Sequence, residues 1–158
     1  MKTMFVGLGL ILTGSLFFAW TRASAATMPP VVINELMWMG SSLSSSDEWI
    51  ELRNTTNAPI ALAGWTLHKL SGGTQSLMLT LPESVIEANG YLLVANDSAA
   101  TSRLAVQPDV VSSNVSLVNS KLQISLYDTA GTLIDQADDG VGNPLAGAYT
   151  SGTAWKSM

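Results

Sequence analysis

The feature that most constrains this chain is the spacing of its apolar residues after residue 30. They alternate with polar residues or form short runs, and Gly, Pro, Asn, Asp and Ser interrupt them. In one segment Ile50 and Leu52 fall on one face of an extended chain, and Trp49 falls on the other. Such spacing is typical of short strands with one buried face. No stretch beyond residue 30 sustains the 3.6-residue period of a helix, so we predict an all-β fold.

Many short strands at this spacing predict an antiparallel β-sandwich in which two sheets cover one core. The clearest hairpin has its loop at Asp128–Gly131, and residues 96–110 read as a loop. Val115–Val118 is a candidate short strand, and the apolar run Tyr91–Ala95 suits a strand covered on both faces. The expected core consists of Ile50, Leu52, Trp65, Leu67, Leu79, Leu93, Leu122, Ile124 and Leu126.

The first 25 residues have the pattern of a secretory signal peptide. Lys2 precedes an uncharged run from Thr3 to Trp20, and Ala23-Ser24-Ala25 supplies an Ala-x-Ala exit. We predict cleavage between Ala25 and Ala26, with retention of residues 3–20 as a membrane anchor as the alternative. Under either interpretation, a spacer at residues 26–30 leads into a chain outside the cytoplasmic membrane. The predicted location is therefore extracellular or cell-surface, with a membrane-anchored protein as the alternative.

Composition excludes several classes of function. The chain has no cysteine and one histidine, so disulfide scaffolds, cysteine nucleophiles and multi-histidine metal sites are impossible. Seven Lys and Arg face twelve Asp and Glu, for a net charge of −5. Removing residues 1–25 takes away Lys2 and Arg22 and leaves a net charge of −7. Because binding to phosphate backbones needs clustered cations, a nucleic-acid partner is disfavoured.

Several segments together resemble the lamin tail domain family. The pattern E-W-I-E-L-x-N followed by L-x-G-W-x-L is the most specific part, and the order and spacing match across residues 31–137. The segments that carry the resemblance are Val32–Leu36, Asp47–Asn54, Leu62–Leu67, Asn89–Val94 and Tyr127–Asp135. The resemblance implies an immunoglobulin-like β-sandwich without catalytic residues. Bacterial members are typically exported, alone or beside nucleases or proteases, whereas animal members are the protein- and chromatin-binding tails of nuclear lamins.

The last residues depart from the family pattern. Members usually continue past a tryptophan into a Ser-(Leu/Met)-Glu-Arg segment that forms a final strand, whereas this sequence stops after Trp155–Met158. We therefore expect the Gly-rich residues 138–158 to be a truncated segment that packs loosely. An unpaired sheet edge would follow, because nothing would replace the missing strand.

The candidate interaction surface is Trp38, Met39 and Trp49. Trp38 lies between two methionines just before a serine-rich loop, and Trp and Met are both favoured at contact surfaces. The alternative is that Trp38 or Met39 caps one end of the core. No catalytic, cofactor-binding or metal-binding residue is predicted.

The acidic residues near the first two strands are the main candidates for other chemistry. One hypothesis is a calcium site built from Asn34, Glu35, Asp47, Glu48 and Glu51. The other is a purely structural role, in which Glu35 and Glu51 make hydrogen bonds or ion pairs, for example with Arg53 or Lys69, and fix the strand register. The structural role is preferred. A glycosidase pair of Glu35 and Glu51 lacks a sugar cleft, and His68 is interpreted as a strand residue without a nucleophile.

The functional hypothesis is an exported, non-catalytic binding module that presents a surface to a protein or a cell-envelope polymer. Two alternatives remain open. One is an accessory-domain fragment of a larger exported nuclease or protease, and the other is a membrane-tethered structural domain. Membrane contact is expected only if residues 3–20 are retained, and no cofactor is expected.

Overall fold

The structure, a computed structural model, describes residues 28–150 and 154–158. Within these residues the chain forms strands and loops without a helix, so no helix there could cross a membrane. The first main sheet has the order β1-β2-β7-β8, and its pairs are antiparallel except for β7 with β8. Its strands are β1 (Val31–Met37), β2 (Trp49–Asn54), β7 (Tyr91–Ala95) and β8 (Val110–Val111).

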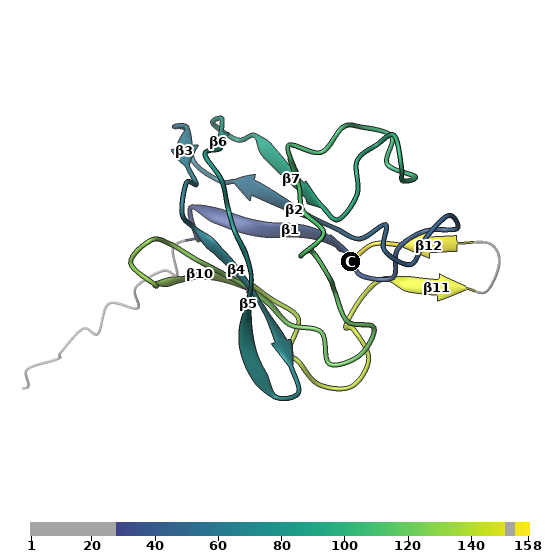
Figure 1. Cartoon of the computed structure of the whole chain (residues 1–158). Coiled ribbons are helices and arrows are strands. Elements are labelled where there is room, and N and C mark those ends of the chain that lie inside the picture. Colours follow the sequence, from purple (N-terminus) through teal and green to yellow (C-terminus); the bar gives the residue numbers. More distant parts are fainter. Residues whose placement is uncertain (1–27, 151–153) are drawn as a thin grey trace, which may run out of the picture.

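The second main sheet is antiparallel throughout and has the order β10-β9-β4-β5. Its strands are β10 (Leu133–Ala137), β9 (Ile124–Tyr127), β4 (Thr66–Ser71) and β5 (Thr74–Thr80). Two small antiparallel ribbons complete the described fold, β3 (Ile60–Ala61) with β6 (Val85–Ile86) and β11 (Ala148–Thr150) with β12 (Ala154–Lys156). Figure 1 shows the two main sheets as layers, with the β11–β12 ribbon projecting from one end.

The core lies between the two main sheets and follows the predicted alternation. Ile50 and Leu52 of β2 lie opposite Val94 and Leu92 of β7, and all four side chains are buried. From the other sheet, Leu67, Ile124 and Leu126 are also fully buried. Burying one such side chain contributes on the order of 1.5–3 kcal/mol of transfer free energy. The predicted all-β sandwich is therefore confirmed.

The hairpin between β9 and β10 shows how local chemistry sets the register. Asp128 Oδ1 accepts hydrogen bonds from the backbone N–H groups of Ala130 and Thr132, each at 2.8 Å, and Gly131 has a φ of 77°. The bond from Thr132 is the main reason that the pKa of the Asp128 carboxyl is lowered. The predicted turn at Asp128–Gly131 is confirmed.

Three members of the predicted core are less buried than expected. Leu93 lies opposite Glu51 on the outer face of β7, so Leu92 and Val94 take its place in the core. For the same reason β7 is not covered on both faces, and Tyr91 is 53% exposed. Leu79 and Trp65 are only partly buried against the core.

A register shift in β5 explains the position of Leu79. Leu67 pairs with Leu79 but His68 pairs with Leu77, so Met78 is the extra residue of a bulge. Met78 is 5% exposed, whereas Leu77 is 57% exposed. The simple alternation of leucines in this strand is thus interrupted by one residue that turns inward.

The segment Val115–Val118 lies in a loop, so the prediction of a strand there is wrong. Side chains of other segments hold this loop by hydrogen bonds, in place of pairing with a neighbouring strand. The Leu117 N–H donates to Glu48 Oε2 at 2.9 Å, and Lys69 Nζ donates to the carbonyl of Ser116 at 3.0 Å. Val115 and Leu117 are nevertheless buried, which is why the segment has an apolar pattern.

The last residues pack more closely than expected. Leu36 and Met158 exchange two backbone hydrogen bonds, at 2.9 and 2.8 Å, so the edge of β1 is paired at this point. Trp155 and Met158 lie partly buried against the core, and the Trp38 indole N–H donates to the carbonyl of Ala146 at 3.2 Å. The expectation of loose packing is therefore wrong for these side chains.

Candidate binding site

The last register pair of β1 and β2 places two large side chains on the outer face of the first sheet. Met37 lies opposite Trp49, and Trp49 in turn lies opposite Ala95 of β7. Residues directly opposite each other point to the same face of a sheet, so Met37 and Trp49 are neighbours there. Both are half-buried, whereas their strand neighbours Leu36 and Ile50 point into the core.

A tight loop after β1 forms the polar side of this site. Gly40 has a φ of 69°, and a Cβ at this position would lie 2.5 Å from the carbonyl oxygen of Ser44, so the turn requires glycine. The backbone N–H groups of Ser41 and Asp47 both donate to that carbonyl, at 2.8 and 3.2 Å. The loop therefore closes on itself and brings Ser41 next to Asp47.

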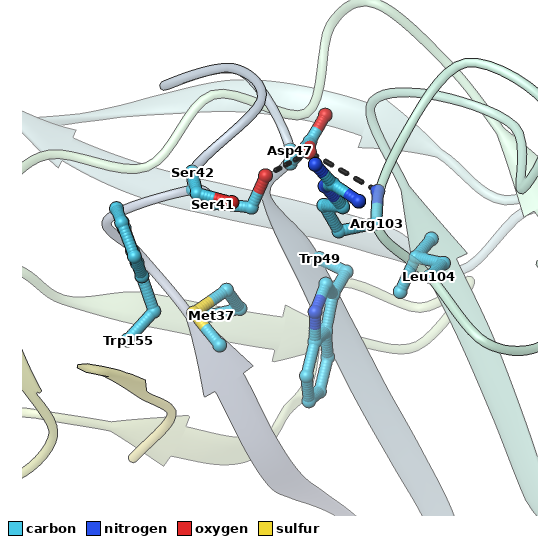
Figure 2. Close-up of a pocket in the computed structure, with 9 residues that line it drawn as sticks. Met37, Ser41, Ser42, Asp47, Trp49, Arg103, Leu104 and Trp155 are labelled. Atoms are coloured by element: carbon cyan, nitrogen blue, oxygen red, sulfur yellow. Dashed lines mark hydrogen bonds between the residues drawn. The ribbon is translucent and has the colours of Figure 1, made fainter. Parts of the chain in front are cut away.

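Asp47 connects this loop to the one that follows β7. Its Oδ2 accepts hydrogen bonds from the Ser41 hydroxyl and from the backbone N–H of Arg103, the latter at 3.2 Å (Figure 2). The residue is only 4% exposed. Its other oxygen, Oδ1, is buried and accepts no hydrogen bond from the residues that the structure describes. An acceptor left in this state costs free energy that a suitable donor would recover.

The third wall comes from the end of the chain. Trp155 belongs to β12, and the paired bonds between Leu36 and Met158 fix this strand beside β1. Figure 2 shows the Trp155 and Trp49 rings nearly edge-on, on either side of the Met37 side chain. Residues more than one hundred positions apart thus form one aromatic and sulfur-containing surface.

These walls enclose two neighbouring hollows, which we together call the aromatic groove. The first has a volume of about 500 Å³ and is lined by Met37, Gly40, Ser41, Ser42, Asp47, Trp49, Arg103, Leu104 and Trp155. The second, of about 420 Å³, is lined by Trp38, Met39, Ser41, Ser45, Asn119 and Trp155. Ser41 and Trp155 belong to both linings, so the hollows adjoin.

The structure places the three predicted surface residues in different environments. Trp49 lies on the first hollow as an outward, half-buried side chain. Trp38 and Met39 are only 9% and 8% exposed and belong to the core, although both contribute to the lining of the second hollow. Their burial agrees better with the alternative, in which Trp38 or Met39 caps one end of the core, than with an open contact surface.

Sequence reasoning missed Met37, Arg103 and Trp155 as parts of this site. Met37 precedes the serine loop and Trp49 follows it at a similar distance, so a hairpin of the two strands would have placed them opposite each other. Nothing in the sequence indicates that Arg103, from a polar loop, or Trp155, from the last strand, would join them.

The acidic residues of the calcium hypothesis are held by separate partners. Glu35 and Glu51 lie opposite each other, but Glu51 accepts from the Asn34 amide at 2.6 Å and Glu35 accepts from the Ser157 hydroxyl. These hydrogen bonds differ from the predicted pairing with Arg53 or Lys69. No group of three or more potential metal-ligating side chains exists among the described residues.

Glu48 occupies the most unusual electrostatic position of the acidic residues. Its side chain is buried beneath the loop that contains Leu117, whose N–H donates to Oε2. Burial raises the pKa of Glu48 from 4.5 to about 7, although the Leu117 N–H and the charge of Lys69 oppose the shift. Glu48 lines neither hollow of the groove, so its role is to hold the loop.

His68 lies within the second sheet as a strand residue. Its ring packs against Tyr127 in a T-shaped arrangement with centroids 4.9 Å apart, and its Nε2 lies 3.2 Å from the Thr66 hydroxyl. These neighbours give the ring a packing role, which agrees with the interpretation of the sequence.

Comparison with known protein families identifies the class of protein that this fold and surface define. The profile of the Lamin Tail Domain family matches residues 24–140. The chain therefore belongs to the lamin tail domain family, a group of immunoglobulin-like modules that are generally non-catalytic. A search of curated proteins gives no significant match.

The groove has the composition of a recognition surface. Two indoles and a thioether offer large contact area, and Asp47, Arg103 and the serines offer both hydrogen-bond acceptors and donors. A few polar groups set into an apolar and aromatic wall are typical of sites that bind small molecules or polymer segments.

Proposed function

We propose that this chain is an exported, non-catalytic binding module that presents the aromatic groove to a protein or polymer partner of the cell envelope. The observation that carries the proposal is the outward pair of Met37 and Trp49 beside Trp155. Large apolar side chains that gather beside a hollow on the outer face of a sheet are typical of a contact site.

Export is supported by the sequence alone. The basic start, the uncharged run and the Ala-x-Ala exit fall within residues 1–25, which lie outside the described residues. The predicted net charge of −7 after cleavage suits a soluble module and opposes binding to phosphate backbones.

Binding would depend on the partner filling the groove and excluding water from the two indoles. Aromatic side chains in partly enclosed pockets supply a large share of the binding free energy in known interfaces. The surrounding charges, Asp47 and Arg103, would then orient the partner rather than provide most of the affinity.

The test uses the full chain expressed in a secretion-competent bacterial host. We expect the exported protein to begin at Ala26 by mass spectrometry and to be retained on washed cell-envelope fragments. Trp49→Ala should lower retention about tenfold or more, because aromatic anchors commonly contribute over 2 kcal/mol. Tyr91→Ala is the matched control, since Tyr91 is an exposed aromatic on the same sheet outside the groove.

Two results would contradict the proposal. One is a chain that stays in the cytosol with residues 1–25 attached. The other is envelope retention that Trp49→Ala leaves unchanged while thermal melting shows the variant to be folded.

A further inference from the structure

We propose that the ligand of the aromatic groove is a neutral polysaccharide chain. This inference rests on the proposed function and names the class of its ligand. Three properties of the groove support it: the aromatic walls, the balance of charge and hydrogen-bonding groups, and the presence of two adjoining hollows.

The aromatic walls match the surface of a sugar ring. The face of an indole carries negative charge density, and the C–H groups on one side of a sugar ring carry partial positive charge. A flat ring can therefore lie against Trp49 or Trp155 while its hydroxyls stay at the edge. Met37, between the two indoles in Figure 2, adds a polarizable contact at the base.

The polar groups match the hydroxyls of a sugar. A hydroxyl both donates and accepts, and the first hollow offers the exposed guanidinium of Arg103 as a donor and the hydroxyls of Ser41 and Ser42. One negative and one positive side chain line this hollow, so a ligand without net charge suits it best.

The second hollow suggests a chain of sugar units instead of a single unit. It adjoins the first through Ser41 and Trp155, and it again combines an indole with small polar side chains, here Trp155 with Ser45 and Asn119. Two similar neighbouring sites suit a polymer whose chemistry repeats along its length.

An extended peptide fits the groove less well. Peptides often bind by adding a strand to a free sheet edge. The edge of β1 beside the groove is already occupied, because Leu36 uses both its N–H and its carbonyl to pair with Met158. A peptide would therefore lack the backbone hydrogen bonds that usually supply its affinity there.

The experiment is affinity electrophoresis of the exported protein in native gels that each contain one soluble polysaccharide. The probes are dextran, mannan, xylan and a β-1,3-glucan as neutral polymers, and polygalacturonate as an acidic one. We expect at least one neutral polymer to retard the wild-type protein and polygalacturonate to have little effect. Trp49→Ala should weaken the retardation about tenfold or more, and Arg103→Ala should weaken it several-fold.

Tyr91→Ala serves again as the matched control and should migrate like the wild-type protein in every gel. Arg103 is exposed, so its truncation tests the groove even if Trp49→Ala fails to fold. Circular dichroism of each variant establishes that it is folded before migration is compared.

The outcomes separate the ligand class from the proposed function. If no neutral polymer retards the protein, or if both groove variants are retarded like the wild type, the polysaccharide proposal is wrong. Envelope retention could still depend on Trp49 and be competed by an extended peptide but by no sugar polymer. In that case the proposed binding function is supported, and only the polysaccharide proposal is wrong. If neither binding depends on Trp49, both proposals fall.

Discussion

At the scale of single residues, the molecule separates side chains by the face of the strand on which they lie. Leu36 and Ile50 are fully buried, whereas their neighbours Met37 and Trp49 form the outer wall of the groove. The period of two in a strand forces this division, since successive side chains point to opposite faces. We therefore expect stability and the proposed recognition to depend on different residues of the same two strands.

Leu67→Ala should destabilise the protein strongly. Leu67 is fully buried between the sheets, and truncating a leucine in a close-packed core costs about 2–5 kcal/mol through lost transfer free energy and a residual cavity. The partly buried Leu79 is the comparison, and Leu79→Ala should cost less. Urea titration of both variants measures the difference, and equal losses would contradict the assignment of the core.

Glu48 should make stability depend on pH. Its pKa of about 7 in the folded protein exceeds 4.5, the ordinary pKa of a glutamate carboxyl, which the unfolded chain has. Between pH 4.5 and pH 7 the folded state therefore holds a proton that the unfolded chain releases. The stabilising contribution is fully present below pH 4.5 and is lost as pH rises through 7. A shift of this size corresponds to roughly 3 kcal/mol.

Glu48→Gln removes this titration and keeps an oxygen for the Leu117 N–H. The variant should match the wild-type protein near pH 4.5 and exceed its free energy of unfolding at pH 8. Urea titrations of the two proteins at both pH values isolate the effect of Glu48 from those of other carboxyls. A difference between the proteins that stays constant with pH would contradict the raised pKa.

At the scale of elements, sequence patterns predicted the strands well and their details less well. The turn at Asp128–Gly131 and the inward residues of β2 follow from local chemistry and period. The bulge at Met78 does not, because it depends on how β5 pairs with β4. The prediction that Leu93 lies in the core is wrong because a continuous apolar run does not show which residues face inward. Only the pairing of β7 with β2 decides this.

The same limit explains why the groove was only partly predicted. Trp49 could be assigned to the outer face from its own strand, but Trp155 and Arg103 reach the groove through tertiary contacts. Contacts between residues far apart in the sequence leave no periodic pattern. The sequence leaves open whether Trp38 belongs to a contact surface or caps the core, because a residue near the end of the chain helps to cover it, as its bond to Ala146 shows.

The β11–β12 ribbon should be sensitive to a methyl group at Gly147. A Cβ there would lie 2.7 Å from the carbonyl oxygen of Lys156 and 2.8 Å from Trp38 Nε1. Gly147→Ala should therefore displace the ribbon, lower the melting temperature and remove the Trp155 wall of the groove. Gly142→Ala is the matched control, because Gly142 also has a positive φ, of 67°, but has nothing within 4 Å of its Cβ position.

Thermal unfolding followed by tryptophan fluorescence compares the two glycine variants. A loss of stability that is the same for both would mean that only backbone strain is involved. The packing of the ribbon against Trp38 would then be of little importance.

At the scale of the whole molecule, a two-sheet sandwich places its core between the sheets and leaves its ends open to solvent. The strands use their inner faces for the core, and the loops after β1 and β7 meet the β11–β12 ribbon at one end (Figures 1 and 2). Lamin tail domains are immunoglobulin-like modules, and in such sandwiches the loops and strand ends are free to vary without disturbing the core. The groove occupies this kind of position.

Hydroxyl-radical footprinting with and without envelope fragments would test most directly whether this end of the sandwich is the binding surface. Radicals oxidise exposed methionine and aromatic side chains, so a bound partner protects those that it covers. We predict that Met37 and Trp49 become protected while the exposed Met28 and Tyr91 do not. Protection of Tyr91 without protection of Trp49, or no change at any of these residues while the protein is retained, would contradict the assignment of the groove as the binding surface.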